Sequence, residues 1–73
     1  MMAANDGDRD LQQRHELYVH VAETHERAAA IYAEAVDTLE HAGDFKTAEH
    51  ERVLAYEQRQ KALVARQRAD NAQ

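Results

Sequence analysis

Histidine and glutamate are the residues of this chain whose types and spacing suit chemistry. Five of the 73 residues are histidine, and Glu16, His20 and Glu23 follow one another at intervals of four and three. Residues at these intervals share one face of an α-helix, where two carboxylates and an imidazole form a candidate ligand set for zinc or iron. The alternative is a solvated helix face on which these side chains pair with one another.

The stronger motifs of metal sites and enzymes do not occur in the sequence. It has no Glu-x-x-His, as in di-iron bundles, and no His-Glu-x-x-His, as in zinc proteases. It also has no cysteine and no serine, and a two-helix chain has too few elements to enclose a substrate. We therefore predict a non-enzymatic protein without a cofactor, and keep a metal-binding helical bundle as the alternative.

The elements that carry these residues follow from a seven-residue repeat in the first half of the chain. One row of the repeat consists of Leu11, Tyr18, His25, Tyr32 and Leu39, and a second row, four residues later, of His15, Ala22, Ala29 and Val36. Such rows predict one face of a long α-helix. His25, in the middle of the first row, has two interpretations. In the first, His25 meets its own copy in an assembly and makes that assembly sensitive to pH. In the second, it forms a hydrogen bond to Tyr18, to Tyr32 or to the second helix.

The sequence predicts a single all-α domain, a long antiparallel helical hairpin. Gly43 suits a left-handed helix end and Asp44 suits the start of the next helix. Asp6 or Asp8 suits the start of the first helix. The expected segments are a frayed start over 1–7, helices over 8–41 and 45–69, a turn over 42–44 and a loose tail over 70–73.

The second helix also repeats every seven residues. Its seam is formed by Ala48, Ala55, Ala62 and Ala69, with Phe45, Tyr56 and Leu63 on the same stripe. Four residues after the first three alanines come Arg52, Arg59 and Arg66, which we expect to flank the seam with their aliphatic stems. Val53, Leu54 and Val64 lie off the stripe, either singly exposed or as a second contact surface.

A Gly-Asp-aromatic turn at 43–45 is followed by small residues at Ala48 and Ala55, and Tyr32 and Leu39 precede it. The stretch 32–63 therefore resembles a single tetratricopeptide-repeat hairpin. It departs from that family at Val36, Arg52 and Gln60, which replace a small residue, an aromatic residue and a proline. The resemblance implies the geometry of the turn but not peptide binding, since stable arrays need about three repeats. The overall pattern is also similar to small helical proteins of high-GC bacteria.

The charge is acidic overall, with a formal net charge of −5. Arg52, Arg59 and Arg66 align along one helix face and could contact phosphates. The acidic net charge of the chain disfavours nucleic acid as a partner. No apolar run approaches the roughly 20 residues that span a bilayer, and the first ten residues do not have the pattern of a signal peptide. We therefore expect a cytoplasmic protein that does not contact a membrane.

A hairpin shields each helix on one side only, so the larger apolar residues need a partner. We expect a homodimeric, antiparallel four-helix bundle with two-fold symmetry. The alternatives are a monomeric hairpin and a bundle completed by a different protein. The expected role is that of an assembly or adaptor module acting through protein–protein contacts. Its expected contact residues are Tyr18, Val21, His25, Ile31, Tyr32, Val53 and Leu54.

Overall fold

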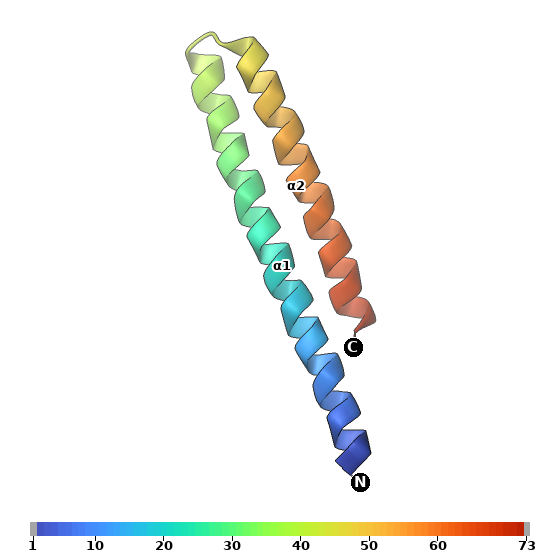
Figure 1. Cartoon of the computed structure of the whole chain (residues 1–73). Coiled ribbons are helices and arrows are strands. Elements are labelled where there is room, and N and C mark those ends of the chain that lie inside the picture. The colour runs from blue at the N-terminus through green and yellow to red at the C-terminus, as the bar shows by residue number, and fades with distance from the viewer. Residues whose placement is uncertain (1, 73) are drawn as a thin grey trace.

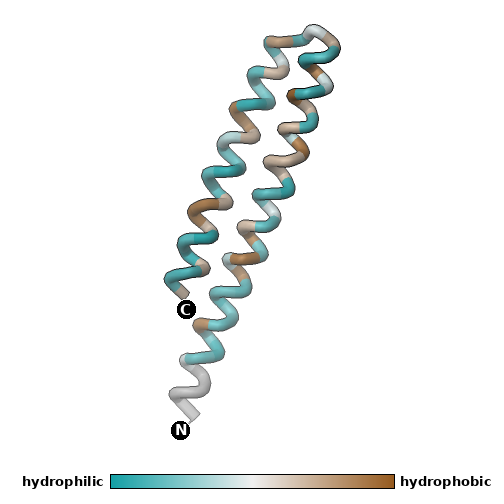
Figure 2. The backbone as a smooth tube through the Cα atoms, turned by 180° about the vertical axis from the view of Figure 1, so that it is seen from behind, coloured by the Kyte–Doolittle hydropathy of each residue, from teal (hydrophilic) through white to brown (hydrophobic). Residues whose placement is uncertain are grey.

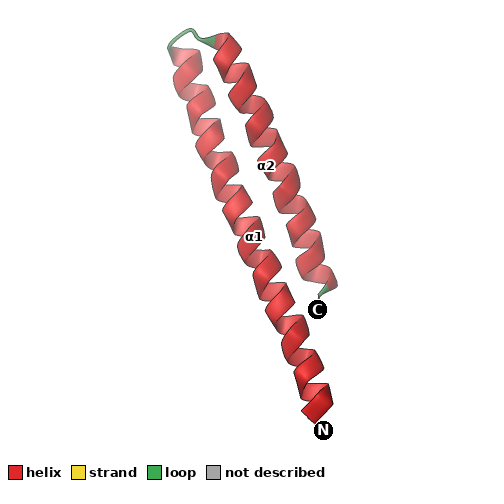
Figure 3. Cartoon of the chain, in the orientation of Figure 1, coloured by secondary structure: helices red, strands yellow, loops and turns green. Residues whose placement is uncertain are grey.

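The computed structural model describes the backbone of residues 2–72 and the side chains of residues 7–72. Helix α1 runs over Met2–His41 and helix α2 over Phe45–Asn71, and three residues join them. The helices lie side by side and antiparallel, and α1 projects beyond the end of α2 (Figures 1 and 3). The predicted all-α hairpin is confirmed, and the described backbone contains no strand.

Both helices are longer than the sequence predicted. Helix α1 begins at Met2 rather than at residue 8, so Asp6 and Asp8 lie within the helix and do not cap it. No proline interrupts this segment, and a glycine inside a helix, as at Gly7, costs only about 1 kcal/mol relative to alanine. Helix α2 continues to Asn71, and Ala72, expected in a loose tail, is buried. Met1 and Gln73 lie outside the described residues.

The turn between the helices satisfies the backbone groups at the end of α1 and the start of α2. Gly43 has a φ of +80°, in the left-handed region that glycine adopts without a steric penalty. Its amide donates to the carbonyl of Glu40 at 3.0 Å, and the amide of Asp44 donates to the carbonyl of Leu39 at 2.9 Å. These two bonds form a Schellman motif. The Asp44 carboxylate then accepts from the amide of Thr47 at 3.1 Å, which caps α2.

The core is a narrow seam of small side chains. Among residues 7–72, the buried apolar residues are Ala22, Ala29, Val36, Ala48, Ala55, Ala62, Ala65, Ala69 and Ala72. Alanine rows on both helices let the two backbones approach closely and leave no room between them for larger side chains. The predicted alanine seam of α2 is confirmed, whereas its larger stripe residues Phe45, Tyr56 and Leu63 are exposed.

The large residues of α1 lie at the edge of the seam rather than at its centre. Tyr18, His25, Tyr32 and Leu39 are half-buried, and Leu11 is exposed. The centre is occupied by the second row of the repeat, the row of Ala22 and Ala29. Figure 2 shows that apolar positions recur at intervals along both helices.

The molecule is a thin rod of 64 × 13 × 11 Å with a radius of gyration of 17.6 Å, against about 11 Å for a compact domain of this length. Its accessible surface is 5594 Å², about 1,000 Å² more than the roughly 4,600 Å² typical of a folded monomer of this mass. Part of the excess belongs to the turns of α1 that project beyond α2. The rest comes from the two open sides of the hairpin.

Candidate functional site

The two long sides of the hairpin differ in chemistry. We call one the ion-pair face, because it carries Glu26 and Glu40 of α1 and Arg52, Arg59 and Arg66 of α2. We call the other the apolar face, which is formed along α1 by Leu17, Tyr18, Val21, Ala28, Ile31 and Tyr32 and along α2 by Leu54, Lys61, Val64 and Ala65. The helical repeat places these two sets on opposite sides of the alanine seam.

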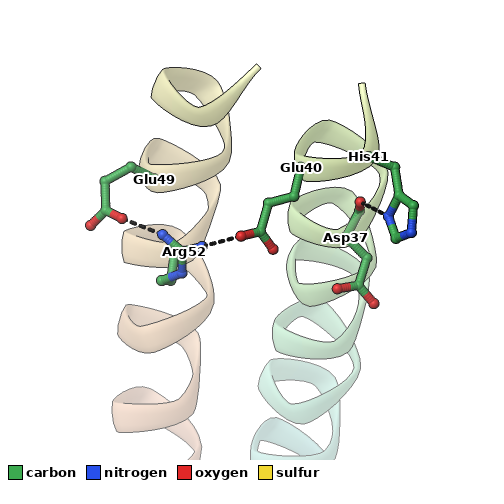
Figure 4. A network of polar contacts seen from close by, with 5 residues as sticks. All are labelled: Asp37, Glu40, His41, Glu49 and Arg52. Atoms are coloured by element: carbon green, nitrogen blue, oxygen red, sulfur yellow. Dashed lines mark hydrogen bonds and ion pairs between the residues drawn. The ribbon is translucent and has the colours of Figure 1, made fainter. Parts of the chain in front are cut away.

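On the ion-pair face, two arginines of α2 bridge to glutamates of α1. Arg66 contacts both carboxylate oxygens of Glu26, at 2.8 Å from Nη2 and 3.3 Å from Nε. Arg52 binds Glu40 at 3.2 Å and also contacts Glu49 of its own helix, so it links the two helices near the turn (Figure 4). In the same view, the ring of His41 donates to the carbonyl of Asp37 at 2.8 Å, which closes the last turn of α1.

The two bridges occupy the same place in the repeat, two heptads apart on each helix. By the same spacing, Arg59 falls between them on α2 and Ala33 takes the place of the glutamate on α1, and no ion pair involves Arg59 among the described side chains. The arginine row therefore flanks the seam, as the sequence predicted. Two of its three guanidinium groups are held by carboxylates, which leaves little of the row for phosphates.

The Glu26–Arg66 pair perturbs both of its members. The hydrogen bond from Arg66 lowers the pKa of the Glu26 carboxyl and outweighs desolvation, which raises it, and the positive charge of Arg66 adds to the lowering. The same hydrogen bond raises the pKa of Arg66. Both side chains are about half exposed. The pair therefore contributes little to the free energy of unfolding, although it links the two helices.

The apolar face contains a groove of about 450 Å³ between the helices. Its lining is formed by Leu17, Tyr18, Val21 and His25 of α1 and by Gln60, Lys61, Val64, Ala65 and Arg68 of α2. Charged heads occur only along the α2 wall. Apolar side chains therefore line both walls of the groove, and Leu17 and Val64 among them are exposed.

The floor of this groove holds a polar contact between the helices. His25 donates from Nδ1 to Oε1 of Gln58 at 2.6 Å, and both residues are half-buried. Of the two interpretations of His25, the structure shows the bond to the second helix. A comparable contact lies ten residues earlier, where His15 donates to the carbonyl of Ala69 at 2.8 Å. The two contacts fix the register of α1 against α2.

Six of the seven predicted contact residues lie on the apolar face or at its edge. Val53 is the exception, because it occupies the side of α2 that is turned away from α1. The predicted contact residues did not include Lys61 or Val64, although the sequence left Val64 open as part of a second contact surface. The intervals of seven and three residues that connect Leu54, Lys61 and Val64 could have placed them on one side of the helix.

The candidate metal ligands do not converge. Glu16, His20 and Glu23 are all exposed on α1, and Glu16 accepts a hydrogen bond from Gln12 at 3.3 Å. Within the part of the chain whose side chains are described, no three histidine, aspartate or glutamate residues are arranged to hold a metal ion. The arrangement is that of a solvated helix face.

Over the described residues, neither helix has an apolar stretch long enough to cross a membrane. The chain matches no protein-family model, no curated protein and no solved structure. The resemblance of the stretch 32–63 to a tetratricopeptide-repeat hairpin therefore rests on its residues alone.

Proposed function

We propose that this protein is a non-enzymatic assembly module that pairs with a second copy of itself through the apolar face. The observation that carries the proposal is the difference between the two sides of the hairpin. On one side, ion pairs already connect the helices. On the other, Leu17 and Ile31 are 56% and 65% exposed beside an open groove.

The size of the exposed surface supports the same conclusion. Each partner in a stable protein–protein contact buries about 800 Å², which is close to the excess surface of this chain. A second copy would supply the two helices that a hairpin lacks for a four-helix bundle. A different protein that covers the same face is the second form of this function, as an adaptor.

The test uses two leucines of equal exposure on opposite faces. Leu17 on the apolar face and Leu63 on the ion-pair side are both 56% exposed. We expect the wild-type protein to be a dimer by light scattering at micromolar concentration. The Leu17→Gln variant should dissociate at least tenfold more readily, whereas Leu63→Gln should remain dimeric.

Circular dichroism separates loss of pairing from loss of folding in both variants. A wild-type chain that is a folded monomer at 100 μM would refute self-assembly, and the adaptor form would then be tested by pull-down with Leu17→Gln as the negative control. Equal weakening by both variants would show that the apolar face is not the contact.

A further inference from the structure

We propose a specific docking of the second copy, which rests on the proposed function and goes beyond it. The two apolar faces stack with a two-fold axis perpendicular to the helices, at the level of Thr24 and His25. In this arrangement α1 lies antiparallel against α1 of the second copy, and α2 lies antiparallel against α2 of the second copy.

The first support is the symmetry of the apolar residues on α1. Reading outward from the midpoint between Thr24 and His25, the face carries a small or medium residue and then a pair of large ones in both directions. Toward the N-terminus these are Val21, then Tyr18 and Leu17, and toward the C-terminus Ala28, then Ile31 and Tyr32. A two-fold axis at the midpoint therefore places each large pair against the other pair of the second copy.

The second support is the same kind of symmetry on α2. Leu54 and Val64 lie five residues on either side of Arg59, and Glu57 and Lys61 lie two residues on either side. An antiparallel copy of α2 centred there sets each leucine against a valine and each glutamate against a lysine. The face thus complements itself in both shape and charge.

The two midpoints coincide in space, although nothing in the sequence requires this. The hydrogen bond from His25 to Gln58 places the midpoint of α1 level with the segment 58–59 of α2. A single two-fold axis therefore passes through the midpoints of both symmetric patterns, the one on α1 and the one on α2. A face shaped for an unrelated protein has no reason to show two matching symmetric patterns at one level.

The other two-fold arrangement has its axis parallel to the helices and sets α1 against α2 of the second copy. Arg14 and Arg68 line one depression at the same level of the hairpin. That arrangement therefore brings Arg14 of each copy close to Arg68 of the other. It also separates Glu57 of each copy from Lys61 of the other copy, because α2 then packs against α1 rather than against α2. Like charges in contact are unfavourable, so the perpendicular axis is preferred.

The test uses single cysteines, since the natural sequence has none. Thr24 and Thr38 are a matched pair, because each is exposed and each donates its hydroxyl to the carbonyl four residues earlier. In the proposed docking, position 24 lies beside its own copy, within the short Cα separation that a disulfide requires. Position 38 lies about 40 Å from its own copy.

We expect Thr24→Cys to form a covalent dimer under mild oxidation, and Thr38→Cys to remain non-covalent. In parallel, Glu57→Lys alone should raise the dimer dissociation constant at least fivefold, and the exchange Glu57→Lys with Lys61→Glu should restore it. A wild-type dimer in which Thr24→Cys does not cross-link, or Thr38→Cys does, would overturn this docking and leave the proposed function intact. A wild-type chain without a dimer would overturn both.

Discussion

The imidazole of His25 donates to the side-chain oxygen of Gln58 across the alanine seam, at 2.6 Å. The other members of the His25 row are leucines and tyrosines. Both side chains are half-buried. If one of them is removed, water can only partly replace the hydrogen bond that the other loses. The pair therefore fixes the register of the hairpin at the level where the apolar face is centred.

This relationship gives a prediction on stability. The Gln58→Leu variant leaves the imidazole of His25 without its acceptor and should lower the free energy of unfolding by about 1 kcal/mol. The double variant His25→Leu with Gln58→Leu should recover the loss, since two apolar groups replace two bonded polar ones. Urea unfolding of the wild type, both single variants and the double variant measures the coupling. Additive effects of the two substitutions would show that the bond contributes nothing.

A second prediction concerns acid. Since the pKa of Glu26 is lowered in the folded chain, its pairing with Arg66 stabilises the fold above the ordinary pKa of a glutamate. That contribution is lost as the pH falls through the lowered pKa. Thermal unfolding between pH 7 and pH 3 should show a smaller fall in Tm for Glu26→Gln than for the wild type. Glu34→Gln, on the outer side of α1, is the control and should behave like the wild type.

A third prediction adds the missing bridge. The seven-residue spacing of the two ion pairs that span the helices places Ala33 and Arg59 at the equivalent positions between them. The Ala33→Glu variant should complete the row and stabilise the hairpin by about 0–1 kcal/mol at low salt. Ala33→Gln isolates the effect of the charge. A gain in Tm that persists unchanged in 1 M NaCl would contradict an ionic origin, because salt screens exposed pairs.

The closeness of the seam can be tested with two neighbouring alanines. Ala29 is buried at 6% exposure, and Ala30 beside it is exposed. The Ala29→Leu variant should separate the helices and cost about 1–3 kcal/mol, as overpacking does. Ala30→Leu should change the free energy of unfolding by less than about 0.5 kcal/mol. Equal effects of the two substitutions would mean that the helices are loosely packed.

The turn gives a fifth prediction. Apart from its chain neighbours, no residue has an atom within 4 Å of a Cβ added at Gly43, so the main penalty of an alanine there comes from the backbone at φ +80°. Gly43→Ala should cost about 1–2 kcal/mol. Gly43→Asn should cost less, because asparagine tolerates the left-handed region. Thermal unfolding of the two variants checks the order, and the reverse order would indicate that the turn changes conformation.

Local features of this fold could be predicted from the sequence, because each depends on few residues. Gly43 and Asp44 were sufficient to predict the turn, and the alanines seven apart were sufficient to predict the seam of α2. The flanking position of Arg52 and Arg66 followed from the same repeat. Each of these is a property of one helix or one turn, which sequence intervals describe well.

The properties that depend on two helices could not be predicted in the same way. Two adjacent rows of α1 fit the repeat equally well, and the interval of seven does not say which row is central. The contact of two alanine rows decides it, and Tyr18 and Tyr32 are displaced to the edge. The partners of the basic residues were also missed. Arg66 pairs with Glu26, for example, because the register between the two helices brings them together.

A core of eight alanines and one valine has a consequence for the cell. Little apolar area is buried within one chain, so an isolated hairpin of this size is close to the lower limit of stability. If a second copy supplies the remaining burial, the temperature of unfolding rises with protein concentration by mass action. The folded fraction then follows the amount that is synthesised. In that case dilution lowers the folded fraction, because the hairpin alone buries little apolar area.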